Sequence, residues 1–392
     1  MGEQALAAII LAAGQGTRMK SDLHKVLHPV AGLPMLHHLL ESLTAAGALR
    51  QVVVVGARRE QVEASVTGRD VAIAHQAEQL GTAHAALQAK SALADFDGIA
   101  IVCFGDTPFL KPDTIRRLTE RLSAADAPRV AVLGFTPDDA KAYGRIIADA
   151  DGNIAKMVEF KDASDHERSV KLCNSGVTAV RTADLWSLLE RVGNDNAAGE
   201  YYLPDIVMLA LADGDRAVVV ETDAHELIGI NSRAELAEAE GIWQTRRRTA
   251  AMADGATLIA PETVWFAHDT VMGRDVVIEP NVFFGPGVTI ADDVVIHAFS
   301  HLEGATVASG CSVGPFARLR PGAQMQEGAK VGNFVEMKKA VLGPGAKASH
   351  LTYLGDATVG ANANIGAGTI TCNYDGYFKY QTVIGENAFI GS

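Results

Sequence analysis

Two different hydrophobic periods divide the chain. Over residues 1–230, short apolar runs alternate with amphipathic segments. The β-branched apolar runs predict strands at 5–11, 52–55, 71–74, 99–104, 130–135 and 218–220. The amphipathic segments predict helices at 35–43, 60–66, 83–92, 112–122, 183–192 and 202–212. This alternation indicates an α/β domain with a mainly parallel sheet, which binds ligands beyond the carboxyl ends of its strands.

After Gly255 the apolar period becomes six. The repeated positions are 278, 284, 290, 296, 302 and Ala308, then 313, 319, 325, 331 and 337, then 342, 348 and 354, and finally 359, 365, 371, 384 and 390. A six-residue apolar repeat predicts a parallel β-helix whose interior is filled by the repeated side chain. Between the two halves, Ser232 and Glu235 form a capping box that predicts a long helix. The predicted domains are therefore 1–231, a linker helix at 232–254, and 255–392.

Composition narrows the class of protein. The net charge of −13 argues against a nucleic-acid binder, because a phosphate backbone needs a basic face. No apolar run reaches the length of a membrane span, so we expect no membrane partner and a cytoplasmic location. The four cysteines lie far apart without a CxxC spacing, and each is expected to be a small buried apolar residue.

The turn after the first predicted strand carries the first candidate chemistry. Its sequence from Leu11 to Lys25 is LAAGQGTRMKSDLHK. Small residues such as Gly14 let backbone amides approach a phosphate, and Arg18 and Lys25 add two cations. The same pattern also suits an ordinary glycine-rich turn. It is neither a complete dinucleotide fingerprint, since Met19 stands at the third glycine position, nor a Walker motif.

A candidate metal ligand follows the strand predicted at 99–104. In CFGDTPFL, Asp106 comes after Gly105 at the carboxyl end of that strand. A carboxylate in this position can hold Mg²⁺ between phosphates. The alternative is that Asp106 only begins the turn before Pro108.

Several motifs together resemble a known family. The signature LxxGxGTRM followed by Lys25 is similar to that of nucleotidyltransferases that make nucleotide sugars, although His24 replaces a proline and Phe104 a frequent tyrosine. QAEQLGT at 76–82, YGR at 143–145, CNSG at 173–176 and EYYLPD at 200–205 follow in the family's order. Over its whole length the chain resembles the bacterial bifunctional N-acetylglucosamine-1-phosphate uridyltransferase/glucosamine-1-phosphate N-acetyltransferases. The implied fold is a Rossmann-like nucleotidyltransferase domain, a linker helix and a left-handed parallel β-helix of hexapeptide repeats.

The resemblance implies a first reaction and its residues. UTP would react with N-acetylglucosamine-1-phosphate to give UDP-N-acetylglucosamine and pyrophosphate, for use in the bacterial envelope. Arg18 and Lys25 would be catalytic, and Asp106 and Asn231 would bind Mg²⁺. The implied substrate contacts are Leu11, Ala12, Ala13, Gly14, Lys25, Gln76, Gly81, Thr82, Gly105, Asp106, Gly144, Glu159, Asn174 and Asn231.

The β-helix carries a second group of polar motifs, NFVEMKK, SHLTYLGD and NIGAGTITCNYDG. His350 is a candidate base, because acetyl transfer to an amine requires loss of the ammonium proton. The resemblance implies acetyl-CoA and glucosamine-1-phosphate as substrates, Glu336 as the residue that orients His350, and a homotrimer. The implied substrate contacts are Arg320, Lys338, Tyr353, Asn364, Ala367, Asn373, Tyr374, Lys379 and Ser392.

Three alternatives remain at this point. His297, His301 and His350 could bind zinc, although His297 and His301 lie several coils from His350. The β-helix could be regulatory, or the whole chain could be a non-catalytic interaction subunit. Because the chain stops at Ser392 inside a repeat, we also expect a shortened β-helix with impaired acetyl transfer.

Overall fold

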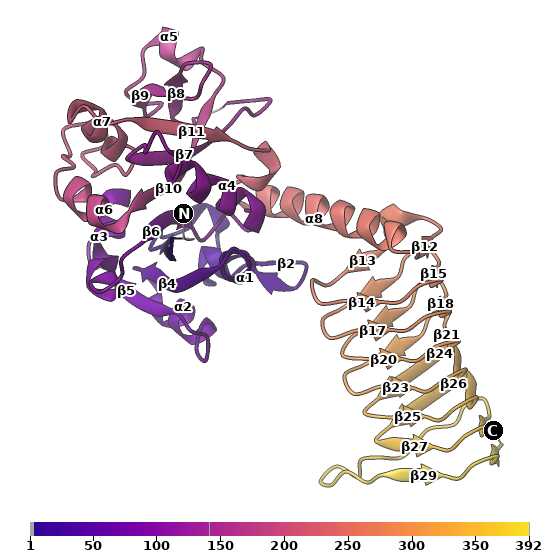
Figure 1. The fold of residues 1–392 in the computed structure, drawn as a ribbon. Coiled ribbons are helices and arrows are strands. Elements are labelled where there is room, and N and C mark those ends of the chain that lie inside the picture. The colour runs from indigo at the N-terminus through magenta and orange to yellow at the C-terminus, as the bar shows by residue number, and fades with distance from the viewer. Residues whose placement is uncertain (1–3, 141, 392) are drawn as a thin grey trace. The chain divides into compact units, whose positions relative to one another are not determined.

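The computed structural model describes residues 4–140 and 142–391. The chain forms two compact units (Figure 1). The first comprises Met1–Pro29 and Pro34–Leu236, and the second Val30–Leu33 and Ala237–Ser392. In sequence, the boundary falls inside helix α8 (Arg233–Ala253).

A mixed sheet forms the centre of the first unit. Its main strands are β1 (Leu6–Ala12), β4 (Ala48–Val55), β5 (Ala72–His75), β6 (Ile99–Phe104), β7 (Val130–Phe135), β10 (Cys173–Arg181) and β11 (Ala217–Glu221). They lie in the order β11-β7-β10-β6-β1-β4-β5. The pairs of β1 with β4 and β6, β4 with β5, and β11 with β7 are parallel, as expected. Strand β10 is antiparallel to both β6 and β7.

Three strands were not predicted from the sequence: β8 (Arg145–Ala148), β9 (Ile154–Val158) and β10. In β10 the ladder with β7 is irregular between Asn174 and Thr178. Asn174, Ser175 and Gly176 interrupt the apolar pattern there, so the segment reads as a loop. The irregularity begins directly after Asn174, which still pairs with Gly134 of β7, and it lies at the carboxyl ends of β6 and β7.

Helices cover both faces of this sheet (Figure 1). Side chains of α1 (Met35–Ala45), α2 (Arg59–Ser65) and α4 (Pro112–Leu122) pack with one face of β1. Side chains of α3 (Thr82–Leu87), α6 (Thr182–Leu189) and α7 (Asp205–Ala212) pack with the other. Every residue of β1 is therefore buried, which explains why its sequence is continuously apolar. The smaller elements are β2 (Pro29–Val30), β3 (Leu33–Pro34), α5 (Asp165–Arg168) and the 3₁₀ turns η1 (Thr17–Met19), η2 (Lys25–Leu27), η3 (Gln88–Leu93), η4 (Ala224–Glu226) and η5 (Pro261–Thr263).

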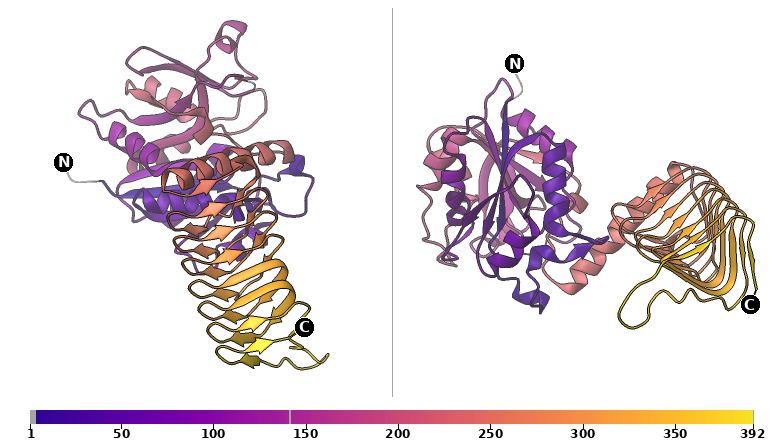
Figure 2. Two further views of the ribbon diagram at one scale, coloured as in Figure 1. Left: turned by 90° about the vertical axis from the view of Figure 1, so that its right-hand side faces the viewer. Right: turned by 90° about the horizontal axis from the view of Figure 1, so that it is seen from below.

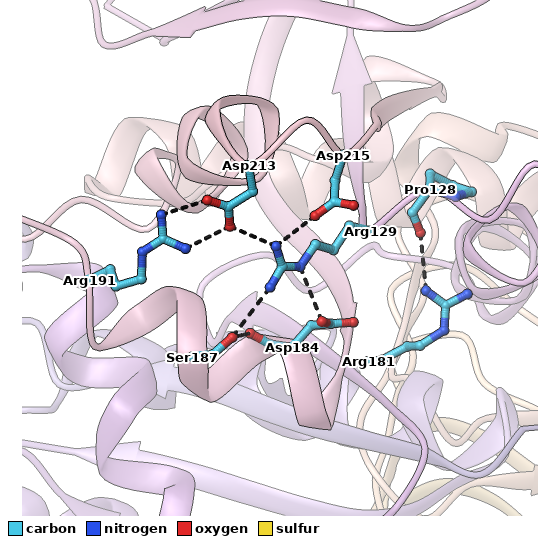
Figure 3. Close-up of polar contacts among 8 residues, drawn as sticks. All are labelled: Pro128, Arg129, Arg181, Asp184, Ser187, Arg191, Asp213 and Asp215. Carbon is cyan, nitrogen blue, oxygen red and sulfur yellow. Dashed lines mark hydrogen bonds and ion pairs between the residues drawn. The ribbon is translucent and has the colours of Figure 1, made fainter.

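A cluster of charges ties β7 to α6 and α7 (Figure 3). Arg129, at the start of β7, donates to Asp184 at 3.1 Å, Asp213 at 2.8 Å and Asp215 at 2.7 Å. Arg191 makes two further bonds to Asp213, at 2.6 and 2.8 Å. The Arg191 guanidinium, with help from Arg129, lowers the pKa of Asp213 to about 2. Asp213 therefore stays ionised in the folded protein at all ordinary pH values.

The second unit is a left-handed parallel β-helix that follows α8. Seen nearly end-on in the right-hand view of Figure 2, its coils are three-sided. Its strands are β12 (Thr257–Leu258), β13 (Trp265–Phe266), β14 (Val271–Met272), β15 (Val277–Ile278), β16 (Phe283–Phe284), β17 (Thr289–Ile290), β18 (Val295–Ile296), β19 (His301–Leu302), β20 (Thr306–Val307), β21 (Ser312–Val313), β22 (Arg318–Leu319), β23 (Gln324–Met325), β24 (Lys330–Lys338), β25 (Val341–Leu342), β26 (Lys347–Gly355), β27 (Ala357–Val359), β28 (Asn364–Ile365), β29 (Thr382–Ile384) and β30 (Phe389–Ile390).

The repeated apolar positions fill the interior of the β-helix, with one correction. Leu302 is fully buried, but the next inward residue is Val307, and Ala308 is only half-buried. The step from Leu302 to Val307 is five residues, as are the later steps to Leu342 and Val359. A shortened turn moves the phase there. The prediction of Ala308 as an inward residue was therefore wrong, because its phase was continued for one turn too many.

Helix α8 closes the first coil of the β-helix. Buried Gln244 donates to the carbonyl of Phe266 at 2.7 Å and accepts from its amide at 2.9 Å. Arg247 and Arg248 donate to the carbonyls of Thr270 and Val264. These bonds satisfy backbone groups at the exposed end of the solenoid. Across residues 4–140 and 142–391, the structure has no helix with the length and apolar character needed to cross a membrane.

The cysteines follow the prediction in three of four cases. Cys103, Cys173 and Cys311 are buried thiols, and burial raises the pKa of Cys103 most. Cys372 is exposed, against expectation, because it precedes the loop that leaves the solenoid after Thr371.

Candidate active sites

A cavity of about 220 Å³ opens at the carboxyl ends of β1 and β6. Nine of the residues proposed from the sequence line it: Leu11, Ala12, Ala13, Gly14, Lys25, Gln76, Gly81, Thr82 and Asp106. Six further residues line it, none of them predicted as a substrate contact: His24, Val26, Gln79, Ala85, Phe104 and Glu200. Gln79 lies in the QAEQLGT motif, so the motif itself was the available signal.

The glycine-rich turn packs directly on the base of Lys25. Gly16 has a φ of +62°, and a Cβ at this position would lie 2.7 Å from Lys25 Cβ. Glycine is therefore required by both backbone conformation and space. A Cβ on Gly14 would meet nothing within 4 Å, so the backbone there faces open space beside the cavity. This exposed backbone is what a phosphate-binding turn needs.

His24 stands where the resemblance predicts a proline. It caps η2, because its Nδ1 accepts from the Val26 amide at 3.4 Å. Its own amide donates to Gln61 Oε1 at 2.7 Å. The φ of −58° is close to the value that proline imposes. Hydrogen bonds thus hold the conformation that a pyrrolidine ring would have fixed covalently.

Lys25, Asp106 and Asn231 meet at the edge of the cavity. The Lys25 ammonium donates to Asp106 Oδ2 at 2.5 Å and to Asn231 Oδ1 at 3.0 Å. Asp106 follows β6, and its carbonyl accepts from the Ile230 amide, which brings the segment before α8 alongside. Glu235 accepts from the Asn231 amide at 2.6 Å and thereby fixes its backbone. Half of the predicted capping box forms as expected, since Ser232 Oγ accepts from the Glu235 amide.

The donor set at this point is suited to a hard divalent cation. A carboxylate and an amide oxygen are ligands that Mg²⁺ accepts, with phosphates and water completing its six-fold coordination. The Lys25 ammonium already places one positive charge between these two oxygens. In the part of the chain that the structure describes, no three His, Cys, Asp or Glu side chains gather as a metal centre would require. A metal here would therefore take its remaining ligands from water or from a bound substrate.

Gly81 and Gln76 shape the opposite wall of the cavity. Gly81 has a φ of +120°, and a Cβ there would lie 2.5 Å from the carbonyl oxygen of Tyr201. Buried Gln76 donates to the Gly81 carbonyl at 3.1 Å and contacts His84 Nδ1 at 3.0 Å. Thr82 Oγ1 accepts from the Leu203 amide. The motif QAEQLGT, which ends at 82, and the motif EYYLPD, which begins at 200, are thus held together.

Gly144, Glu159 and Asn174 form a second group beside the cavity. The Asn174 amide donates to the Gly144 carbonyl at 2.9 Å, and a Cβ on Gly144 would lie 3.2 Å from Glu159 Oε1. Asn174 Oδ1 accepts from Gly176, whose bare Cα packs on the ring of Phe104 in the cavity wall. Burial, followed by the charges of nearby aspartates, raises the pKa of Glu159. This group supplies polar atoms next to the end of the cavity formed by Phe104.

Six predicted residues of the first unit do not line the cavity: Gly144, Glu159, Asn174 and Asn231, described above, and Arg18 and Gly105. Arg18 is exposed on η1, within the glycine-rich turn. Gly105 packs at the base of the cavity, where its amide donates to the Leu11 carbonyl and a Cβ on Gly105 would approach the Val26 side chain. Gly105 therefore joins β1 to β6 at the base of the site.

In the β-helix, the residue that contacts His350 differs from the one expected. Asn333 pairs with His350 between β24 and β26, and its Oδ1 lies 2.8 Å from His350 Nδ1. Glu336 is three residues further along β24, level with Tyr353, and accepts from Arg320 at 2.8 Å. The strand register thus separates Glu336 from His350, and the expected orienting contact is absent from the described residues. With Nδ1 held by Asn333, Nε2 is the nitrogen left to take a proton.

The remaining predicted residues of this unit lie in the neighbouring coils and loop. Lys338 pairs with Gly355, and Asn364 with Lys347. Ala367 lies one coil beyond His350, since the next amide, Gly368, donates to the Leu351 carbonyl. On the loop after Thr371, Asn373 donates to Asp356 at 2.6 Å, and Tyr374 pairs with Lys379. Ser392 lies outside the described residues.

The zinc alternative gains no support from the geometry. His297 contacts Glu279 at 2.9 Å and Ser312 at 3.1 Å, and His350 contacts Asn333. His301 stacks on Phe283. The three imidazoles therefore have separate surroundings.

Comparisons with known proteins agree with both halves of the fold. Residues 8–143 match the model of the MobA-like NTP transferase domain, and residues 269–304 match the bacterial transferase hexapeptide model of six repeats. The chain is 67% identical to the bifunctional protein GlmU of Novosphingobium aromaticivorans over 389 residues, which cover 99% of this chain and 86% of the relative. This chain belongs to the GlmU family.

Other GlmU proteins are similar over the same extent. The protein of Rhizorhabdus wittichii is 66% identical, with 100% of this chain and 87% of the relative covered. That of Sphingopyxis alaskensis is 63% identical, with 99% and 85% covered. The predicted family and fold class are thereby confirmed. The expectation of a shortened chain with impaired acetyl transfer receives no support.

Proposed function

We propose that this GlmU-family chain is a bifunctional enzyme with one activity in each unit. The first unit transfers uridylyl from UTP to N-acetylglucosamine-1-phosphate and releases pyrophosphate. The second transfers acetyl from acetyl-CoA to glucosamine-1-phosphate. The observation that carries the first assignment is the meeting of Lys25, Asp106 and Asn231 beside a cavity walled by the glycine-rich turn.

In the first reaction, the sugar phosphate oxygen attacks the α-phosphorus of UTP, and pyrophosphate leaves. The nucleophile is already anionic, so no protein base is required, and catalysis is positioning plus charge neutralisation. Gln76, Gly81 and Thr82 are placed to hold the uracil, and Gly144, Glu159 and Asn174 the sugar. Arg18 and Lys25 offset charge on the polyphosphate. Asp106 and Asn231 would hold Mg²⁺, which supplies further charge neutralisation on the reacting phosphates when bound.

In the second reaction, His350 Nε2 takes a proton from the amine of glucosamine-1-phosphate. The neutral nitrogen attacks the acetyl carbonyl, and coenzyme A leaves as the thiol. Asn333 holds the ring by its other nitrogen, which fixes the tautomer needed for this step. Arg320, Lys338, Tyr353 and Lys379 are proposed to bind the sugar phosphate. Asn364, Ala367, Asn373, Tyr374 and Ser392 are proposed to contact the acetyl donor or its acetyl group.

We also propose a homotrimer formed through the β-helix. Phe299, Phe316 and Phe334 stack on one another at successive corners, with ring centroids 5.0 and 5.3 Å apart. Their exposed fractions are 53%, 47% and 55%, and Leu351 extends the row at 60%. A continuous exposed apolar row supports burial against further copies of the chain. Sedimentation equilibrium tests this directly, since a mass of one chain at micromolar concentration contradicts it.

A cytoplasmic location stays a prediction.

The experiment for the first activity measures pyrophosphate release from UTP and N-acetylglucosamine-1-phosphate with Mg²⁺, and again with EDTA. Metal-dependent release specific for UTP is expected. The second assay follows the free thiol of coenzyme A with glucosamine-1-phosphate as acceptor. Absence of both activities in the folded protein would favour the interaction-subunit alternative, and absence of the second alone would favour a regulatory β-helix.

A further inference from the structure

The Lys25 ammonium lies where two proposed metal ligands converge. It contacts Asp106 Oδ2 at 2.5 Å and Asn231 Oδ1 at 3.0 Å. The side chains of Lys25 and Asp106 are only 16% and 14% exposed. An ammonium group is a compact cation with three donors and no acceptor, so it can satisfy both oxygens at once. In this arrangement Lys25 itself neutralises the Asp106 carboxylate.

A divalent cation cannot bind the same two oxygens while the ammonium remains. Mg²⁺ needs its oxygen ligands at about 2.1 Å, which would place it in the volume that the ammonium now fills. Two positive charges at this separation in a partly buried site would also repel each other strongly. Metal binding to Asp106 and Asn231 therefore requires Lys25 to move.

The glycine-rich turn offers Lys25 a second position. Because Gly16 packs against Lys25 Cβ, the lysine stem starts directly beside the exposed backbone of that turn. The flexible four-carbon stem can rotate the ammonium from Asp106 toward an anion held on the turn. A nucleotide polyphosphate bound there would attract it.

We propose that Lys25 is an exchangeable internal cation. Without nucleotide its ammonium occupies the position between Asp106 and Asn231. A bound polyphosphate draws the ammonium away and frees both oxygens for the divalent metal. This inference rests on the proposed uridyltransferase function. Polyphosphate and metal then strengthen each other's binding, since coupling between two sites is reciprocal.

The test measures Mn²⁺ binding to the nucleotide-free full chain, from the loss of the free Mn²⁺ signal in electron paramagnetic resonance. Lys25→Gln removes the competing charge, and Lys25→Met does so while keeping a stem that packs on Gly16. Both variants are expected to bind Mn²⁺ about tenfold more tightly than the wild type, within the usual range of coupling between sites. Adding Asp106→Asn to either variant should abolish the gain, because the gained site uses that carboxylate.

Equal or weaker Mn²⁺ binding by a folded Lys25→Met protein, checked by circular dichroism, overturns the exchange. So does a gain that persists when Asp106 is replaced. These results are separable from the proposed function, which is judged on the wild type. Metal-dependent pyrophosphate release by the wild type without a gain in the variants refutes only the exchange. A gain in the variants with an inactive wild type refutes only the uridyltransferase.

Discussion

His24 should make the first unit sensitive to acid. Its side chain is 2% exposed, and within the described part of the chain its Nε2 has no hydrogen-bond partner. Burial, followed by the charges of Lys25, Arg58 and His28, lowers the pKa of His24 from 6.5 to about 4. The folded protein therefore keeps this imidazole neutral at a pH where the unfolded chain protonates it.

The difference of 6.5 − 4, or 2.5 pKa units, corresponds to about 3 kcal/mol at 1.36 kcal/mol per unit. The folded pKa is the lower one, so this contribution is fully present above pH 6.5. It is lost as the pH falls from 6.5 toward 4, because only the unfolded state takes up the proton. Lowering the pH from 7.5 to 4.5 should therefore reduce the free energy of unfolding by about 2.5 kcal/mol through His24 alone.

The assay is urea unfolding at these two pH values, followed by tryptophan fluorescence. Replacing Trp243 and Trp265 by phenylalanine leaves Trp186, in the first unit, as the only reporter. In that background, the unfolding free energy lost between pH 7.5 and 4.5 should be about 2.5 kcal/mol smaller in His24→Asn than in the parent. Asparagine keeps a capping oxygen but does not titrate. Replacing exposed His166 by asparagine should not change the loss. Equal losses in the parent and His24→Asn would refute the reasoning.

Four further outcomes follow from single contacts. Gly176→Ala places a Cβ 2.4 Å from Phe104 Cε2 at a φ of +82°, so uridyl transfer should fall by about tenfold or more while acetyl transfer is unchanged; equal turnover contradicts this. Asn333→Ala frees the His350 ring and should lower the kcat of acetyl transfer about tenfold, with the pH profile as readout; an unchanged profile contradicts it. Arg129→Ala should lower the free energy of unfolding by about 1–3 kcal/mol, measured by urea unfolding against the wild type. The loss should be smaller in 1 M salt, because salt screens the ion pairs. Phe316→Asp should shift sedimentation equilibrium from trimer to monomer, whereas an unchanged mass would place the interface elsewhere.

The regular parts of the fold could be predicted because burial alone decides them. The strand at 99–104 and the helix at 112–122 have the predicted bounds, since one is apolar throughout and the other begins with a proline at its first position. Strand β10 was missed because Asn174, Ser175 and Gly176, at the irregular part of its ladder, interrupt the apolar pattern.

The site could be predicted as a set of residues but not as a geometry. The order of the motifs predicted that Lys25, Asp106 and Asn231 belong to one site. The hydrogen bonds that join them depend on how three separate segments fold together. The contact of His350 with Asn333 rather than Glu336 follows from strand register, in which Val331 pairs with Ala348 and Asn333 with His350. The 17-residue spacing of the predicted inward positions 331 and 348 was the available signal, whereas the expectation of Glu336 came from the resemblance alone. The capping role of His24 required knowledge of where η2 begins.

The central claim is that two independent active sites lie in the two units of the chain. The most direct measurement compares both activities in Asp106→Asn and His350→Ala, as UDP-N-acetylglucosamine formed and coenzyme A thiol released. We predict that Asp106→Asn loses uridyl transfer and keeps acetyl transfer, and that His350→Ala does the reverse. Loss of both activities in either folded variant, or of neither, would contradict the account.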